Sequence, residues 1–375
     1  MRLWHREFWL MAVACLLLAL SVTMLIPTMP LWMLYVEGLS TAETGLAMGA
    51  FALGLFLPGG LCSYRVQHYR RNLVCVWAAL LLAVSVAVPY YLPVVSVLSL
   101  MLLRLVQGAA FGLAQMVLSS TLIIDTCDSF QRTEGNHSAT WFGRFALSLG
   151  PLAGLLLYQA WGFPVVSVAA AGCALLSAVL VLCVHFPFRV PADKVPLWSL
   201  DRFFLTQGWP LFLNLLLVTV AIGMLLSMRL DAQFYGLLMV GFLLALLAQR
   251  FVFRDAELKS EVVAGLATIL AAWFVLYQAP HSEMASPLLG LGLGLVGSRF
   301  LLFFIKLSHH CQRGTAQSTF LIGWECGLAL GLGLGYGLLG ESRLAVLGWS
   351  ALLLVVALLL YHYYIHQWFI DHKNR

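Results

Sequence analysis

The sequence has few charged residues. Only 10% of its 375 residues are Asp, Glu, Lys or Arg, whereas 62% are hydrophobic. A soluble domain carries about 25% charged residues, so this excess of apolar residues is too large to be buried in one core. The shortage of charge argues against a soluble protein and indicates that the surrounding medium is lipid.

Other features are also missing. No Gly-x-x-x-x-Gly-Lys segment occurs, so the sequence contains no phosphate loop for an ATP-driven motor. None of the eight cysteines lies in a segment that we expect outside the cytoplasm, which argues against a disulfide framework. The net charge of +5 is small and comes from loops on one side, so it does not indicate nucleic-acid binding. We expect no metal site and no cofactor.

Apolar stretches of about 20 residues recur along the chain, and each can cross a bilayer as a helix. They are continuously apolar rather than alternating, which predicts helices instead of a β-barrel. The expected fold class is therefore an all-α membrane protein with twelve transmembrane helices. We expect the first stretch to be retained rather than cleaved as a signal peptide. The twelve stretches are 8–35, 44–64, 72–92, 96–120, 137–159, 163–185, 209–228, 232–252, 261–279, 286–306, 315–338 and 344–366.

The longest polar stretch lies between the sixth and seventh of these helices. It predicts two six-helix halves built as structural repeats. The apolar residues Trp198, Phe203 and Phe204 make the end of this stretch amphipathic. Two alternatives stay open for it, a solvated linker and a segment lying on the inner membrane face. The expected parts are 1–186 (first half), 187–208 (cytoplasmic linker) and 209–375 (second half, with a short cytoplasmic tail).

The basic residues fall in alternate loops, and this pattern predicts the orientation of the chain. Only Arg229 and Arg343 fall on the opposite side, and three arginines lie within the membrane. Both termini are therefore expected in the cytoplasm. The sixteen basic residues on the expected cytoplasmic side are Arg2, Arg6, Arg65, Arg70, Arg71, Arg132, Arg189, Lys194, Arg202, Arg250, Arg254, Lys259, Lys306, Arg313, Lys373 and Arg375.

Four charged residues lie deep within apolar stretches. They are Arg104, Arg144, Arg299 and Glu325, on helices four, five, ten and eleven. An ionisable group in a bilayer costs several kcal/mol and is usually functional, so we expect these four to handle protons or substrate. Arg299 and Glu325 lie at similar depths on successive helices and are candidates for an ion pair. Neutral side chains expected to face the same cavity are Gln107, Gln115 and Asn214.

Two motifs resemble those of a known family. Helix four contains Arg104-Leu-Val-Gln107-Gly108, followed by Gly112, and helix five contains Gly150-Pro151-Leu-Ala-Gly154. The first resembles a signature of the major facilitator superfamily, and the second resembles a motif of its drug and proton antiporters. The resemblance implies that helices four, five, ten and eleven line a central cavity. Gly108 and Gly112 favour close helix packing, and the Gly-Pro segment favours a bend that is either a hinge or a static kink.

The segment after helix two departs from the family pattern. The family has Gly-x-x-x-Asp-Arg-x-Gly-Arg-Arg, whereas this chain has Tyr64 in place of the Asp and a stretched spacing. Arg65, Arg70 and Arg71 keep the basic character of the loop. A cytoplasmic latch based on that carboxylate is therefore not expected in its usual form.

Helix eleven carries a row of glycines. Gly323, Gly327 and Gly331 recur at every fourth residue and form one small face. Glu325 lies about 160° from its neighbours in this row, so the glycines can pack while Glu325 faces a cavity. Two interpretations remain, a Glu that exchanges protons or binds substrate and a neutral Glu that only bonds to a neighbouring helix.

The sequence is therefore interpreted as a monomeric secondary active transporter of a small, amphipathic molecule, in a bacterial cytoplasmic (inner) membrane. The favoured mechanism is proton-coupled export, with protons as the second partner. An importer or lipid flippase of the same fold is the alternative. A membrane-embedded enzyme is less favoured because no nucleophile–base pair or metal cluster is evident. A sensor is also less favoured because it would ordinarily add a soluble domain.

The orientation can be tested by labelling. Cysteines introduced at Leu39 and Met284 of a cysteine-free variant should react with an impermeant maleimide in intact cells, because both loops are expected outside. A cysteine at Asp193 should react only after the cells are opened. Equal labelling at all three positions would contradict the expected orientation.

Overall fold

The structure is a computed structural model. It describes residues 3–91, 96–128, 130–186, 196–228, 231–253, 257–280, 282–338 and 342–374. The first part of the expected linker, 187–195, lies outside the described residues, as do several of the basic residues used to predict the orientation. Those basic residues are Arg2, Arg189, Lys194, Arg229, Arg254 and Arg375.

Within the described residues, twelve helical spans are long and apolar enough to cross a membrane. The expected fold class is therefore confirmed. Four spans extend well beyond the predicted stretches: the second continues to His68, the fourth continues to Thr126, the fifth begins at Arg132 and the twelfth continues to His372. Helical hydrogen bonds do not stop where the apolar residues stop, so a helix can continue into the polar interface of the bilayer.

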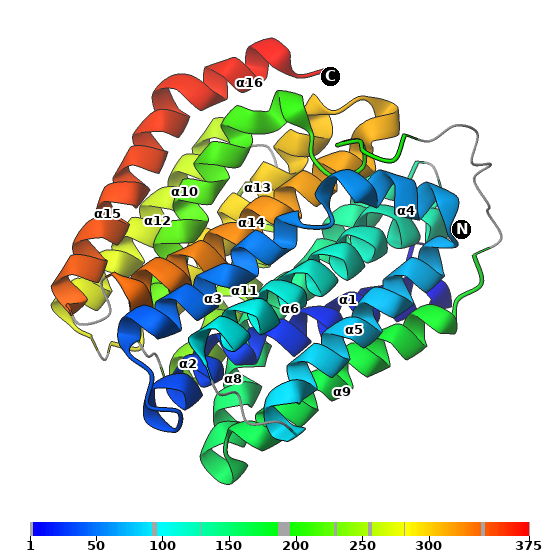
Figure 1. Ribbon diagram of the computed structural model, residues 1–375. Helices are drawn as coiled ribbons and strands as arrows, with labels where there is room; N and C mark the ends of the chain where they lie inside the picture. Colours follow the sequence, from blue (N-terminus) through cyan, green and yellow to red (C-terminus); the bar gives the residue numbers. More distant parts are fainter. Residues whose placement is uncertain are drawn as a thin grey trace.

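The first six spans form one group of helices, here the N-terminal group, in the lower right of Figure 1. It consists of α1 (Arg6–Thr23), α2 (Leu25–Tyr35), α3 (Thr41–Phe56), α4 (Cys62–His68), α5 (Arg71–Tyr91), α6 (Val97–Val117), α7 (Ile123–Thr126), α8 (Arg132–Trp161) and α9 (Phe163–Leu182). The short turns Gly59–Leu61 and Leu118–Leu122 continue the second and fourth spans.

The last six spans form the C-terminal group, in the upper left of Figure 1. It consists of α10 (Trp209–Leu226), α11 (Ala232–Phe251), α12 (Leu258–Gln278), α13 (Ala285–Leu307), α14 (Arg313–Gly337), α15 (Arg343–Leu360) and α16 (His366–His372). The turns Thr206–Gly208 and His310–Gln312 precede α10 and α14, and the π-turn Tyr361–Ile365 joins α15 to α16.

The first span is interrupted between α1 and α2. Pro27 has no N–H to donate to the carbonyl of Thr23, and its ring crowds that carbonyl. Helix α1 accordingly ends at Thr23, and α2 begins at Leu25. The break lies where α8 packs against this span.

The two groups repeat the same helix contacts. Helix α3 packs on α6 in the first group, as α11 packs on α13 in the second. Both contacts are close because glycines meet. A Cβ added to Gly108 would stand 3.0 Å from the Cα of Gly54, and one added to Gly290 would stand 3.0 Å from the Cα of Gly241. Small residues at these positions let the backbones touch, which is how helices associate in lipid.

A second contact is repeated in the same way. Helix α1 packs on α8, and α10 packs on α14. In each case a glycine lies against a threonine, with Gly150 beside Thr23 and Gly327 beside Thr219.

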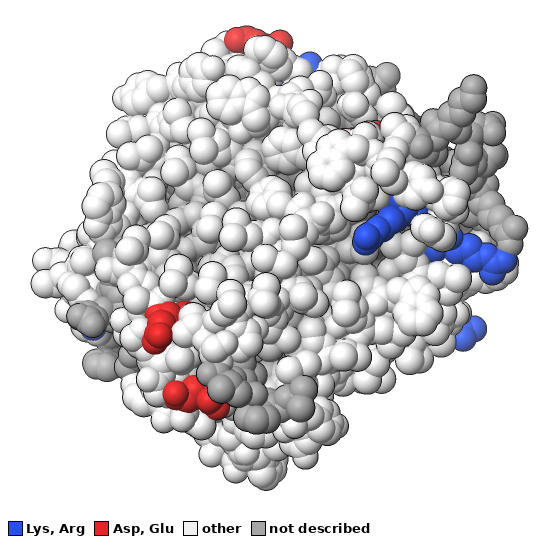
Figure 2. All heavy atoms as spheres, viewed as in Figure 1, with Lys and Arg blue, Asp and Glu red and all other residues white. Residues whose placement is uncertain are grey.

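On the face seen in Figure 2, exposed charged residues lie at the two ends of the bundle and are separated by a broad uncharged belt. We call one end the basic end, defined by Arg65, Arg71, Arg132 and Arg313. The opposite end, the far end, carries Glu37, Glu43 and Glu283. The belt between them matches the hydrocarbon layer, so the protein is a multi-pass integral membrane protein.

The glycine contact between α3 and α6 leads to a prediction about stability. Gly108→Ala should lower the unfolding free energy by about 1–3 kcal/mol, because the new methyl group overlaps the Phe51 carbonyl oxygen. Gly172→Ala is the matched control, since nothing lies within 4 Å of its added Cβ. Thermal unfolding of both variants in detergent measures the difference. Equal midpoints would show that the contact is looser than described.

Candidate functional site

The two groups of helices meet most closely at the far end, where α3 lies beside α14 (Figure 1). An added Cβ at Gly333 would stand 2.9 Å from the Cα of Gly49 and 3.0 Å from the carbonyl oxygen of Gly45. Ser148 of α8 also donates a hydrogen bond to the Tyr235 carbonyl of α11, at 2.6 Å. The backbones touch, so no solute passes here in this conformation.

Among the described residues, two hydrogen bonds between pairs of side chains cross between the groups near mid-membrane. Gln115 Nε2 of α6 donates to Glu325 Oε1 of α14 at 3.4 Å. Arg144 Nη1 of α8 donates to Ser298 Oγ of α13 at 2.8 Å. Glu325 is the middle residue of α14, roughly 18 Å from either end of the helix. These two links join the four helices that the resemblance placed at the cavity.

A small cavity of about 20 Å³ lies beside the first link, and Gln115 forms part of its wall. A volume of this size holds about one water molecule. The polar residues of the wall include Gln115, Ser119 and Thr140. Its lining residues are Cys15, Leu18, Ala19, Phe111, Gln115, Ser119, Ala139, Thr140, Gly143 and Leu321.

Arg299 does not pair with Glu325. Its Nε donates instead to Glu261 of α12, and Gln249 Nε2 donates to the other carboxylate oxygen at 2.9 Å. Neighbouring residues on a helix point about 100° apart. Because Ser298 faces α8, Arg299 points toward α12 instead of α14. Glu261, which the sequence placed at a membrane boundary, is fully buried by this ion pair.

Arg104 and Gln107 lie within the N-terminal group. Arg104 Nη1 donates to Gln107 Oε1 at 3.0 Å, and its Cζ lies 4.5 Å from the centre of the Phe51 ring. Gln107 Nε2 donates to the Ser85 carbonyl of α5 at 3.1 Å. These contacts join α6 to α3 and α5. They do not reach the C-terminal group, although the sequence predicted a place in the cavity.

Asn214 likewise bonds inside its own group. Its Nδ2 donates to the Ala357 carbonyl of α15 at 2.9 Å, and the residue is fully buried. Of the seven embedded charged and amide residues expected at the cavity, Gln115, Arg144 and Glu325 therefore reach the boundary between the groups. Each residue's depth along its helix could be predicted from the sequence, but depth alone does not determine which neighbour the side chain faces.

The Gly-Pro-x-x-Gly motif packs against the break in the first span. A Cβ on Gly150 would stand 3.1 Å from the Met24 nitrogen, and one on Gly154 would stand 3.2 Å from the Met24 carbonyl carbon. Pro151 is buried beside them. The motif therefore lies where the continuous helix α8 touches the interrupted first span.

The other glycines named in the sequence analysis lie where two helices approach each other closely. Gly112 of α6 lies against Leu55, where an added Cβ would be 3.3 Å from Cα. On α14, Gly323 lies against Phe212, and an added Cβ at Gly331 would stand 2.8 Å from the Cα of Gly223. The glycine row thus packs on α10, while Glu325 faces α6.

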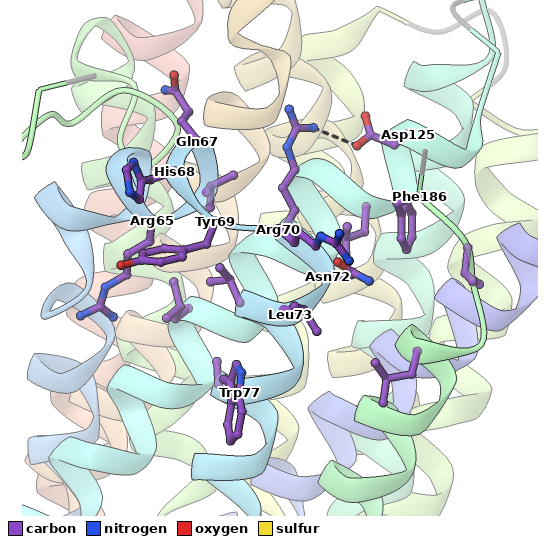
Figure 3. A pocket seen from close by; sticks show the side chains of 18 of the residues that line it. Arg65, Gln67, His68, Tyr69, Arg70, Asn72, Leu73, Trp77, Asp125 and Phe186 are labelled. Carbon is purple, nitrogen blue, oxygen red and sulfur yellow. Dashed lines mark hydrogen bonds and ion pairs between the residues drawn. The ribbon is translucent and has the colours of Figure 1, made fainter. Parts of the chain in front are cut away.

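At the basic end, Arg71 forms an ion pair of 2.9 Å with Asp125, drawn as a dashed line in Figure 3. Asp125 supplies a carboxylate that the segment after helix two lacks. The sequence motifs did not predict this contact between Asp125 and Arg71. Tyr64, which stands where the family has Asp, stacks on His68 with ring centres 4.9 Å apart. Arg65 and Arg70 line an open pocket of about 1080 Å³ at this end.

A second chamber, of about 340 Å³, has walls from both groups of helices. Its charged lining residues are Arg71, Arg132, Arg202, Arg313 and the single acid Asp125. Burial, and then the neighbouring charge of Arg71, lower the pKa of Arg202 below its usual range. The chamber is therefore a region of positive potential open to small anions.

The end of the linker crosses the basic end and contacts both groups. Ser199 N donates to the Gly60 carbonyl at 2.8 Å, and Arg202 N donates to Thr315 Oγ1 at 3.0 Å. Phe203 is buried against the second span, where its ring meets that of Phe56 edge to face. The described part of the linker is thus bound to the protein rather than fully solvated.

Among the described residues, no three His, Cys, Asp or Glu side chains lie close enough together to hold a metal ion. The polar side-chain groups at the boundary between the two groups of helices, near mid-membrane, are amides, a hydroxyl, a guanidinium and one carboxylate. This set can bind a solute and exchange a proton. It does not offer a nucleophile paired with a base.

Comparison with known proteins places the chain among transporters. Residues 11–311 match the Major Facilitator Superfamily. The structure is similar to the human organic anion transporter MFSD10 (TETRAN), with a TM-score of 0.67 and 15% identity over 95% of this chain and 100% of that one. It is also similar to a mutant of the nucleoside transporter NupG, with a TM-score of 0.65 and 15% identity over the same shares. No curated protein sequence gives a significant match.

The Arg299–Glu261 pair should support stability. Glu261→Gln removes one partner of a buried ion pair and should lower the unfolding free energy by about 3–5 kcal/mol. The double variant Glu261→Leu/Arg299→Leu should recover much of that loss, because no unpaired charge remains. Thermal unfolding in detergent measures both. A Glu261→Gln variant as stable as the wild type would contradict the structural role of the pair.

Proposed function

Because the chain belongs to the Major Facilitator Superfamily, we propose that this membrane transporter exports a small amphipathic molecule in exchange for protons. The site lies between the two groups of helices and is exposed alternately at the two ends. The basic end faces the cytoplasm, in line with the placement of Arg and Lys residues. A bacterial cytoplasmic membrane is the proposed location, and the monomer is the proposed working unit.

The observation that carries this proposal is the position of Glu325. It lies halfway along α14, its hydrogen-bond partner is the neutral amide of Gln115, and no ion pair to it occurs within the described part of the chain. A carboxylate held by an arginine would be fixed in its charged form. An amide instead accepts hydrogen bonds through its oxygen and donates them through its nitrogen, so it can partner either form of the carboxyl group.

The link between Glu325 and Gln115 also couples protonation to movement. It crosses from α14 to α6, so a change in the charge of Glu325 alters the contact between the two groups. The glycine contacts close the far end, whereas the arginine-lined chamber is present at the basic end. Opening the far end requires that α3 separate from α14 and that α8 separate from α11.

Replacing Glu325 tests this mechanism. Glu325→Gln keeps the size and hydrogen bonding of the side chain but cannot ionise. We therefore expect it to abolish substrate accumulation driven by a pH gradient in proteoliposomes, while substrate binding is retained. Glu283→Gln, at the far end, is the control and should accumulate substrate normally.

The outcome separates this proposal from its alternatives. Uphill transport by Glu325→Gln would show that Glu325 is not the coupling site. Gradient-driven movement in the opposite direction in the wild type would identify an importer. The orientation of the protein in the vesicles must be fixed by protease cleavage before the direction is assigned.

A further inference from the structure

Arg144 is a buried guanidinium with too few partners. Arg144 is only 3% exposed, and its Nη1 donates a hydrogen bond to Ser298 Oγ at 2.8 Å. Its Nε and Nη2 have no hydrogen-bond partner among the described residues, and no carboxylate there pairs with it. A guanidinium stays charged and has five N–H donors, so a stable arrangement in a dry interior calls for an acceptor or an anion.

Aromatic rings surround this charge. The Arg144 Cζ lies 4.8 Å from the centre of the Trp141 ring, 5.8 Å from that of Phe320 and 6.0 Å from that of Trp324. On the remaining side the guanidinium lies close to α13, where an added Cβ at Gly297 would be 3.1 Å from Cζ. The rings attract the cation but supply no acceptor with negative charge. They also form flat apolar walls beside it.

Further unpartnered polar groups lie on the same helices. Trp141 Nε1 has no hydrogen-bond partner, and neither does the amide of Gln317. Gln317 is fully buried and lies seven residues before Trp324, on the same face of α14. Nε and Nη2 of Arg144 and Nε1 of Trp141 can only donate, whereas the amide of Gln317 and the unpartnered Oγ of Ser318 on α14 can donate or accept, so donors prevail in this set. Unsatisfied buried groups are rare in native proteins, and a donor-rich set matches an anion.

We propose that Arg144, Trp141 and Gln317 bind the negatively charged group of an organic anion, whose flat apolar part lies against Phe320 and Trp324. This inference rests on the proposed transport function and names the class of its substrate. The site is closed in the described conformation. It opens when α8 separates from α13 and α14 as the two groups of helices move apart.

The chamber at the basic end supports the same charge preference independently. It is lined by four arginines and one aspartate, from both groups of helices and the linker. A positive cleft of this kind raises the local concentration of anions and speeds their arrival. An organic anion that comes from the cytoplasm would therefore meet this chamber before it reaches Arg144.

The test measures binding by the full-length protein purified in detergent, without any gradient. The probes are 2-naphthoate, the neutral 2-naphthamide and the cationic 2-naphthylmethylammonium, which share one flat ring system. Calorimetry should show binding of 2-naphthoate that is at least about tenfold tighter than that of the amide, with no binding of the cation. Equal binding of the three probes, or no binding of 2-naphthoate, would overturn the proposal.

Variants then identify the residue that binds the negatively charged group of the probe. Arg144→Gln should weaken 2-naphthoate binding by about 10- to 100-fold, the usual effect of losing hydrogen bonds to a charged group. Arg144→Lys should bind with an intermediate affinity, since Lys keeps the charge but lacks the planar fork. Arg104→Gln is the matched control, because Arg104 is almost as buried but lies between α3 and α6. It should bind 2-naphthoate as the wild type does.

Two further results bear on the proposal. Wild-type affinity in a folded Arg144→Gln or Arg144→Lys variant would overturn it and leave Arg144 as a structural link to Ser298. Binding of phosphatidylglycerol without binding of 2-naphthoate would assign the site to a lipid head group and also overturn it. The binding measurement uses no gradient, so a failure of proton coupling in liposomes leaves this binding result intact.

Discussion

The constraint on which this structure depends is that polar groups in hydrocarbon must be satisfied inside the protein. Arg299 meets this demand through Glu261. Asn214 and Arg104 meet it in part, through a backbone carbonyl of α15 and through Gln107, and each keeps one polar atom, Oδ1 or Nε, without a partner among the described residues. These bonds hold helices together within one group. At the boundary between the groups the demand is met poorly, since Arg144 keeps two unpartnered nitrogens and Gln317 has no partner among the described residues.

Near mid-membrane, helices pack closely within each group, whereas few bonds join the two groups. The interior of each group and the boundary between them therefore have different mechanical roles. Inside each group, glycines bring backbones into contact at repeated positions, such as Gly54 with Gly108 and Gly241 with Gly290. In lipid no hydrophobic force holds helices together, so contacts of this kind must supply the stability. Between the groups, the mid-membrane links are single hydrogen bonds. They can be exchanged for bonds to a substrate or a proton at little cost, which suits a boundary that must open.

Much of the fold could be predicted from the sequence, because lipid imposes apolar runs of fixed length. Those runs showed the twelve spans, although the helices α8 and α16 continue past them. The candidate site could be predicted only in part. The depth of Glu325 and Arg144 followed from their positions in the runs, whereas the partners of Arg104 and Arg299 depend on helix rotation and on neighbours distant in sequence. The aromatic rings around Arg144 could not be predicted from the sequence, because Trp141, Phe320 and Trp324 cannot be distinguished there from other apolar residues of the membrane helices.

The central claim is that the two groups of helices move against each other so that one end opens as the other closes. Spin labels on a cysteine-free background test it most directly, with one pair at Leu39 and Met284 on the far end and another at Tyr69 and Glu257 on the basic end. Distances within each pair can be measured by double electron–electron resonance at acidic and alkaline pH. The account predicts opposite changes, so that the far-end distance lengthens in the condition in which the basic-end distance shortens. A far-end distance that never changes, or two distances that lengthen together, would contradict it.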